Sequence, residues 1–390
     1  MPVMSLNFCA NEPTLGYLYQ IRYGMKLLLD QENDNAVLLI ENIDDISIQS
    51  GSNLDLYQTK FHLNNPPNIA NASSDFWKTI RVWSEKIKSN QLSAGDCVFT
   101  IMTTAAASPG SILENLRYDK IKGRDIDGII ASMINVINNS TSTTNKASYD
   151  AFVALDVDQK KQLVERIVLA DSSEDINKAK DGIIRHLRIV SQNFNPLFDR
   201  LEGWFLGQVI LQLQNLRGGI TYKEMQQTIW DIADSLKSDN LPADFLSSIA
   251  GDENQLLPYR DRMFVKQLEL VKVNPAVINN AISDYHRAFS QSSRWIRDGL
   301  ISAADQMVYQ EKLIDDWSRK FAAVCSPVPG EDSSKAEERG RSFYQNFYVL
   351  QYPTIHIKDR FKEAYMVTGS CQMLSNDKKI GWHPEYGTLV

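Results

Sequence analysis

The stretch AVLLIENIDDISIQSGSNLDLYQTKFH, residues 36–62, decides the fold of the N-terminal part of the chain. It opens with a continuous apolar run that ends at Glu41, alternates after Asp45 and turns at QSGSN. A second alternating segment then places Gln58 and Lys60 on one face. A continuous apolar run is typical of a strand covered on both sides, and alternation is typical of strands in general. The stretch therefore predicts three consecutive strands, with a tight hairpin between the second and the third.

The composition of the chain is that of a globular protein. Its 390 residues predict two domains, and its 43% hydrophobic and 23% charged residues exclude a disordered or fibrous chain. The sequence contains no apolar run of about 18 residues, so we expect no membrane span. The N-terminus lacks a signal-peptide pattern. The four scattered cysteines argue against a structural zinc site, so we expect a cytoplasmic bacterial protein with reduced thiols. The net charge of −7 argues against a wholly basic nucleic-acid binder, although a local basic patch is enough for phosphate contacts.

The first 105 residues predict the element order αβββαβ. A cap residue and a proline, Asn11 and Pro13, begin a helix, and a fourth strand follows at Cys97–Met102. A second helix is expected between the third and fourth strands, over residues 73–88. The expected apolar faces of the two helices are Leu18, Ile21, Met25 and Leu28 in the first, and Phe76, Ile80, Trp83 and Ile87 in the second.

Polar side chains gather where these strands end. If Asp45 begins the second strand and Gln58 and Lys60 end the third, the hairpin brings them together, with Glu41 at the adjoining end of the first strand. Carboxylate and amide oxygens are ligands for a hard divalent cation such as Mg²⁺ or Mn²⁺. Such a cation activates water for phosphodiester hydrolysis, and a neighbouring lysine can hold or help deprotonate the nucleophile. The structural alternative is a set of exposed acids and a chance Q-x-K pattern.

The pattern D-(x)n-Q-x-K within an αβββαβ unit resembles the PD-(D/E)xK restriction-endonuclease superfamily, in the branch where Gln replaces the middle acid. GYLYQ, ENIDDI and YQTKFH together resemble the double-stranded DNA endonuclease domain of the antiphage effectors of CBASS and Lamassu systems. The resemblance implies a restriction-endonuclease-like αβββαβ domain over residues 1–125, of α/β class. It also implies Mg²⁺-dependent cleavage of double-stranded DNA.

The same resemblance assigns roles to individual residues. It makes Asp45 and Gln58 metal-site residues and Lys60 the catalytic lysine, with Glu41 supporting the metal and Gln20 reaching the site from the first helix. Either Asp44 or Asp45 can be the main metal ligand, and Asp45 is favoured because it directly precedes the alternating ISI.

Two further features of this region have an alternative reading. His62 shares a strand face with Lys60 and could contact phosphate, but a surface histidine at a strand end is the commoner case. The segment RYDKIKGR could contact the DNA backbone without reading sequence, although charged runs are usually solvated loops. Its basic residues are Arg117, Lys120, Lys122 and Arg124.

The remainder, residues 126–390, is expected to be an all-α domain for partner binding and assembly, with no second active site. The segment at 197–219 is apolar almost all round and predicts a buried central helix. Residues 274–321 keep an apolar stripe that one long helix would explain. The segments RAFSQSSRWIRDGLI and YQEKLIDDWSRKF and the final GWHPEY stand in the C-terminal part of the chain. By these motifs, residues 255–390 resemble C-terminal domains of ABC-three-component defence effectors, of which Lamassu is the best-known grouping. The resemblance implies an SMC-like ATPase partner, a small accessory subunit and a nuclease that forms homo-oligomers when active.

Three other readings stay open at this stage. The first is a catalytically degenerate domain that binds DNA or serves as an assembly scaffold. The second is a metal-dependent nuclease that acts on RNA. The third is a nucleotide-sensing C-terminal part, which we rank last because the sequence shows no phosphate-binding loop or basic–aromatic pattern there.

Overall fold

The structure is a computed structural model that describes residues 11–60 and 68–389. The chain divides into two compact units, Met1–Asp231 and Ile232–Val390, and each is described by itself. The division differs from the expected boundary at residues 125/126. It comes later because elements after residue 126 complete the sheet and the helical layer of the first unit.

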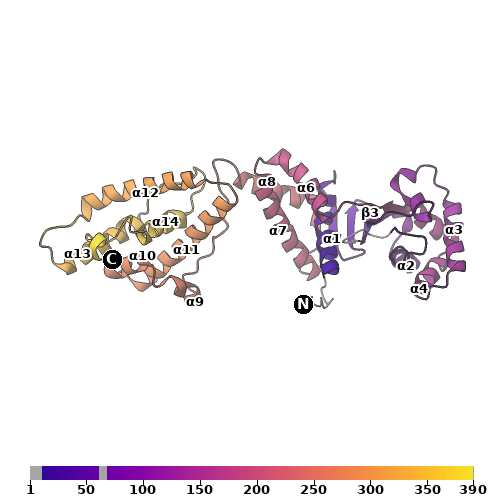
Figure 1. Cartoon of the computed structure of the whole chain (residues 1–390), viewed down its shortest axis with the longest axis horizontal. Coiled ribbons are helices and arrows are strands. Elements are labelled where there is room, and N and C mark those ends of the chain that lie inside the picture. Colours follow the sequence, from indigo (N-terminus) through magenta and orange to yellow (C-terminus); the bar gives the residue numbers. More distant parts are fainter. Residues whose placement is uncertain (1–10, 61–67, 390) are drawn as a thin grey trace, which may run out of the picture. The chain divides into compact units, whose positions relative to one another are not determined.

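Unit 1 is built on a mixed six-stranded sheet with the order β5-β4-β3-β2-β1-β6. Figure 1 labels β3 of this sheet. The strands β1, β2 and β3 form an antiparallel meander, β4 and β5 run parallel to β3, and β6 pairs antiparallel with β1. The strand bounds are β1 Val37–Ile40, β2 Ile46–Ser50, β3 Asn53–Lys60, β4 Cys97–Thr103, β5 Ile167–Ala170 and β6 Ile220–Thr221.

The predicted order of helix, three strands, helix and strand is observed in the first 103 residues. Helix α1 (Asn11–Leu29) crosses β1 closely at Gly24, where an added Cβ would lie 3.0 Å from Cδ1 of Ile40. Helix α2 (Ser74–Lys88) buries all four predicted apolar residues and Trp77. In α1 the expectation was wrong at Leu18, which is 44% exposed, because Tyr19 takes the buried position beside it.

The rest of unit 1 adds helices to both faces of the sheet. Helix α6 packs along α1, where Lys26 pairs with Glu174 at 3.1 Å and Arg22 with Glu202 of α7 at 2.6 Å. Helix α4 packs against α2, and α5 contacts β4. The helix bounds are α3 Ile126–Asn139, α4 Lys146–Val153, α5 Val157–Arg166, α6 Ile176–Val190, α7 Phe194–Leu213 and α8 Tyr222–Ser235, with short 3₁₀ turns η1 Ala94–Asp96, η2 Ile112–Leu116 and η3 Tyr118–Lys120.

Helix α7 is not the fully buried helix that its composition predicted. One face, which includes Phe198, Leu201 and Phe205, packs into unit 1. The opposite face carries Leu206 and Ile210, which are 37% and 46% exposed. Apolar residues on every side of the helix therefore did not determine how many of its sides would be buried.

Unit 2 is a helical bundle around one large core. The predicted long helix over 274–321 is two helices, because Gly299 adopts a φ of +69° and Ser302 caps the next helix in a capping box with Asp305. In the described part of the chain, no helix is long and apolar enough to cross a membrane. The elements are α9 Glu253–Leu256, η4 Leu257–Tyr259, α10 Met263–Leu270, α11 Pro275–Arg297, α12 Ala303–Val324, α13 Ser333–Tyr344, the π-helical η5 Gln345–Leu350, α14 Ala364–Asn376 and α15 Tyr386–Leu389.

Candidate metal centre

The loop between β1 and β2 begins at Glu41 and ends at Asp45. The last ladder pair is Ile40 with Ile46, so Glu41 and Asp45 are the residues that directly adjoin it. The backbone N–H of Glu41 donates to the carbonyl of Asp45 at 3.0 Å, which closes the loop. The loop therefore presents two carboxylates from adjoining strand ends.

The β2–β3 hairpin adds Gln58 to the same row. Its ladder ends at the pair of Ile46 with Tyr57, which Asp45 and Gln58 directly adjoin. Because Lys60 follows Gln58 by two residues at the end of β3, the two side chains share a face of the sheet. Glu41, Asp45 and Gln58 thus form a row of residues that directly adjoin the last ladder pairs of β1, β2 and β3, and their binding of one metal ion stays a prediction.

Thr59 orients the carboxylate of Asp45. Its backbone N–H and its hydroxyl both donate to Oδ2 of Asp45, at 2.8 and 2.9 Å. The hydrogen bonds formed within the described residues leave Oδ1 of Asp45 open to a further partner. Thr59 lies between Gln58 and Lys60 in β3, and its contact with Asp45 was not predicted from the sequence.

Asp44 is engaged inside the protein. The indole N–H of Trp83 donates to its Oδ2 at 2.6 Å, and the backbone N–H of Asp45 donates to its Oδ1 at 3.1 Å. Burial is the main cause that raises the pKa of Asp44 to about 6. Since both carboxylate oxygens have protein donors, Asp44 suits a supporting role for the loop better than direct metal binding.

Glu41 lies at the open side of the site. It adopts a φ of +51°, a left-handed conformation that is uncommon for residues other than glycine. Partial desolvation and then the charge of Asp45 raise the pKa of its carboxyl group, against a hydrogen bond from Gln20 and the charge of Lys60. Gln20 of α1 therefore forms a hydrogen bond with Glu41, and the positive charge of Lys60 acts on the same carboxylate.

The side chains at this site suit a hard cation only if the amide oxygen of Gln58 is one of its ligands. In residues 11–60 and 68–389, no group of three or more His, Cys, Asp and Glu side chains is arranged to hold a metal ion. Glu41 and Asp45 supply two carboxylates, and the amide oxygen of the buried Gln58 would be the third protein ligand. His62 lies outside the described residues.

The basic segment RYDKIKGR divides into two parts. Arg117 forms a bidentate ion pair with Asp171, through Nε at 3.0 Å and a terminal nitrogen at 2.5 Å. Arg124 donates to backbone carbonyls that include those of Val164, at 3.3 Å, and Ile167, at 2.7 Å. These two guanidinium groups stabilise the fold of unit 1, and their possible contact with the DNA backbone stays a prediction.

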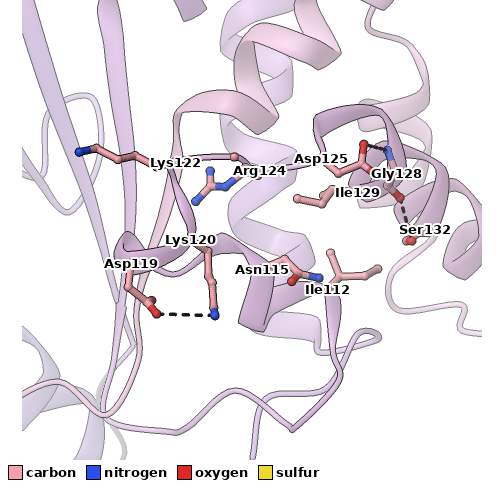
Figure 2. Close-up of a pocket in the computed structure, with 11 residues that line it drawn as sticks. Ile112, Asn115, Asp119, Lys120, Lys122, Arg124, Asp125, Gly128, Ile129 and Ser132 are labelled. Atoms are coloured by element: carbon pink, nitrogen blue, oxygen red, sulfur yellow. Dashed lines mark hydrogen bonds and ion pairs between the residues drawn. The ribbon is translucent and has the colours of Figure 1, made fainter.

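Lys120 and Lys122 remain as exposed cations of this segment. They line a cavity of about 660 Å³ with Asn115 and Ser132 (Figure 2). Lys120 has a loose ion pair with Asp119 at 3.9 Å, and Figure 2 shows Lys122 extended away from the other labelled side chains. Lys120 and Lys122 therefore stay candidates for the predicted phosphate contacts.

Residues 264–390 match the family model of C-terminal domain 7 of the ABC-three component (ABC-3C) systems. The match covers 127 of the 390 residues, so it is a likeness of this C-terminal part to a domain of these systems. The matched residues make up most of the segment 255–390, for which the sequence predicted this resemblance. The finer assignments, to Lamassu and to a nuclease subunit, stay predictions.

Comparison with solved structures finds the Cap4 SAVED/CARF-domain containing receptor of Acinetobacter baumannii at 11% identity and a TM-score of 0.34, covering 72% of this chain and 60% of the receptor chain. The same receptor with the cyclic trinucleotide 2'3'3'-cAAA matches at 13% identity and a TM-score of 0.33, with 73% and 59% covered. The chain therefore spans about 60% of the receptor's length, and a likeness at these TM-scores carries no argument. No curated protein matches the chain.

Proposed function

We propose that unit 1 is a metal-dependent endonuclease that hydrolyses DNA phosphodiesters, as the effector of an ABC-3C antiphage system. The observation that carries the proposal is the row of Glu41, Asp45 and Gln58, with Lys60 two residues further along β3. The family match of residues 264–390 supports the biological setting.

Each side chain has a distinct task in this proposal. Asp45, held by Thr59, and Glu41 offer carboxylate oxygens to Mg²⁺ or Mn²⁺, and Gln58 offers its amide oxygen. The bound cation would supply Lewis-acid activation of water and of the phosphate. Lys60 holds the attacking water and compensates negative charge at the phosphate. Asp44 keeps the loop in place through Trp83.

The proposal extends to partners and assembly. An SMC-like ATPase and a small accessory subunit would hold the nuclease inactive until invading DNA is sensed. One such site cuts one strand, so cleavage of a duplex requires two sites to act together. We therefore propose that the active form is a homo-oligomer.

A degenerate scaffold is the second candidate. It is favoured by the absence of a cluster of three His, Cys, Asp or Glu side chains in the described residues. In that case unit 1 binds nucleic acid without cutting it. A nuclease for RNA is the remaining alternative, because the row of side chains does not discriminate between the two phosphodiesters.

The test is cleavage of supercoiled plasmid by the full chain with Mg²⁺. We expect Asp45→Asn and Lys60→Ala to reduce nicking at least a hundredfold, while the exposed-site controls Asp34→Asn and Lys78→Ala retain it. Equal nicking by all five proteins would remove the assignment of the site. A competition between labelled DNA and RNA of the same sequence decides the substrate.

A further inference from the structure

The outer edge of β1 is covered by a strand over only part of its length. The strand β6 pairs with Val37 and Leu38 of β1 and ends there, whereas β1 continues to Ile40. A buried backbone N–H that lacks a hydrogen-bond partner costs about 1–3 kcal/mol. The edge of β1 beyond Leu38 therefore needs an acceptor from another part of unit 1.

Gln212, in the last turn of α7, supplies this acceptor. Its Oε1 accepts a hydrogen bond from the backbone N–H of Ile40 at 3.2 Å. The two residues are buried, with 8% of Gln212 and 3% of Ile40 exposed. The Nε2 atom of the same amide has no hydrogen-bond partner in the described part of the chain. The bond to Ile40 therefore accounts for a polar side chain on this buried face of α7.

The segment after α7 holds the end of the helix against β1. Arg217 pairs with Glu224 of α8 at 2.8 Å and donates to the carbonyl of Gly219 at 3.0 Å. At Gly219 an added Cβ would lie 2.8 Å from the carbonyl oxygen of Leu38, so the two backbones approach closely. Because Gly219 follows Gln212 by only a few residues, the end of α7 has little freedom to move along β1.

Ile40 directly precedes Glu41, a ligand in the proposed metal centre. Gln212 holds the N–H of Ile40, and the carbonyl of Asp45 holds the N–H of Glu41 at 3.0 Å. The peptide groups on both sides of Ile40 are therefore fixed, and with them the direction in which the chain enters Glu41. Glu41 itself has a φ of +51°, a conformation that persists only where neighbouring contacts impose it.

Two helices act on this end of β1. Gln20 of α1 forms a hydrogen bond with the side chain of Glu41, whereas Gln212 of α7 holds the backbone that precedes it. Both helices contact β1 and each other, and Figure 1 labels both. A hydrogen bond to the carboxylate limits the rotation of the Glu41 side chain, but a hydrogen bond to the backbone decides where that side chain starts.

We propose that Gln212 is a positioning residue of the metal centre, because it holds the end of β1 so that the carboxylate of Glu41 reaches the cation. This inference rests on the nuclease function proposed above for unit 1. Removal of a group that orients a metal ligand typically costs about 10–100-fold in metal affinity. Helix α7 lies outside residues 1–125, to which the sequence assigned the nuclease domain, so the metal centre depends on a later helix.

Calorimetric titration of the metal-free full chain with Mn²⁺ tests this role. Gln212→Met and Gln212→Leu remove the acceptor, and we expect each to bind Mn²⁺ about tenfold more weakly than the wild type, with circular dichroism to check folding. Hydrogen exchange at the amide of Ile40 should be about tenfold faster in both variants. Gln212→Glu keeps an acceptor oxygen at the same reach, so it should restore most of the affinity and the slow exchange at Ile40.

Phe198→Leu separates positioning from general stability. Phe198 is 1% exposed in the same helix, about four turns or about 20 Å before Gln212. This variant should lower the thermal midpoint without changing the Mn²⁺ affinity or the exchange at Ile40.

The outcomes distinguish the role of Gln212 from the metal centre itself. A wild type that binds no Mn²⁺ removes the metal centre and this role together. If the wild type binds, three results overturn the role of Gln212 alone. The first is wild-type affinity in Gln212→Met and Gln212→Leu, the second is a Gln212→Glu variant that binds no better than these two, and the third is an equal loss of affinity in Phe198→Leu.

Discussion

The indole N–H of Trp83 donates to Oδ2 of Asp44 at 2.6 Å, and both side chains are buried. This bond fixes the loop between β1 and β2 against α2. The loop in turn presents Glu41 and Asp45 at the candidate metal centre.

Trp83→Phe should therefore loosen the loop. We expect a loss of about 1–3 kcal/mol in the free energy of unfolding, since a buried carboxylate loses its donor. Hydrogen exchange of the backbone amides of residues 41–46 should accelerate, and plasmid nicking should fall. Thermal unfolding followed by circular dichroism measures the stability.

Trp77→Phe is the matched control for this prediction. Trp77 is equally buried in α2, and its indole N–H donates to the carbonyl of Asn71 at 2.8 Å, away from the loop. It should lose similar stability without faster exchange over residues 41–46. If both variants behave alike at the loop, the bond between Trp83 and Asp44 does not hold it.

The basic segment leads to a prediction that separates stability from DNA binding. Arg124→Ala should cost about 2–4 kcal/mol of stability, because it leaves buried carbonyls of the α5 terminus without a donor. The double variant Lys120→Ala/Lys122→Ala should keep its stability and bind duplex DNA more weakly. Its plot of log affinity against log salt concentration should be shallower by about 1–2.

The exposed lysines of unit 2 provide the control for the charge change. Lys312→Ala/Lys335→Ala removes the same charge from exposed positions and should leave the salt dependence unchanged. Fluorescence anisotropy of a labelled duplex at several salt concentrations measures both pairs. Identical slopes for the two double variants would contradict the assignment of phosphate contacts to Lys120 and Lys122.

The lowered pKa of His286 predicts how the stability of unit 2 depends on pH. Its Nδ1 and the hydroxyl of Tyr259 form a hydrogen bond of 2.8 Å, and burial, followed by the charge of Arg287, lowers the pKa of the imidazole. The unfolded chain therefore binds a proton more readily than the folded one. The contribution to stability is present above about pH 6.5 and is lost as the pH falls below that value.

Thermal midpoints at pH 7.5 and 5.5 measure this effect. The drop in midpoint on acidification should be larger for the wild type than for His286→Gln. A wild type that gains stability relative to His286→Gln in acid would contradict the prediction.

Local patterns in the sequence predicted the part of the fold that local forces decide. Alternation in residues 46–60 and the apolar run before Glu41 gave β1, β2 and β3, and the stripe of α2 is buried as expected. The strands β5 and β6 were missed, because four and two residues carry little periodicity and their partners β4 and β1 lie far away in sequence. The domain boundary was expected too early for the same reason.

Two further differences between the predicted and the observed helices have other causes. Leu18 and Tyr19 are both plausible core residues of α1, and the position of the neighbouring elements decides that Tyr19 is buried. The break between α11 and α12 could have been predicted from Gly299 and from the cap at Ser302.

At the candidate site, residue types and spacing indicated Asp45, Gln58 and Lys60. The supporting contacts of Thr59 and Trp83 depend on the opposite sheet face and on α2, so spacing could not reveal them. The hydrogen bond between Gln212 and Ile40 was also missed, because α7 and β1 lie far apart in the sequence.

Calorimetric titration of the metal-free full chain with Mn²⁺ tests the central claim most directly, because it needs neither DNA nor partner proteins. The account predicts that each chain binds Mn²⁺ at a site lost in Asp45→Asn and retained in the exposed-site control Asp34→Asn. Binding that is absent in the wild type, or identical in Asp45→Asn, would contradict a metal centre at the row of Glu41, Asp45 and Gln58.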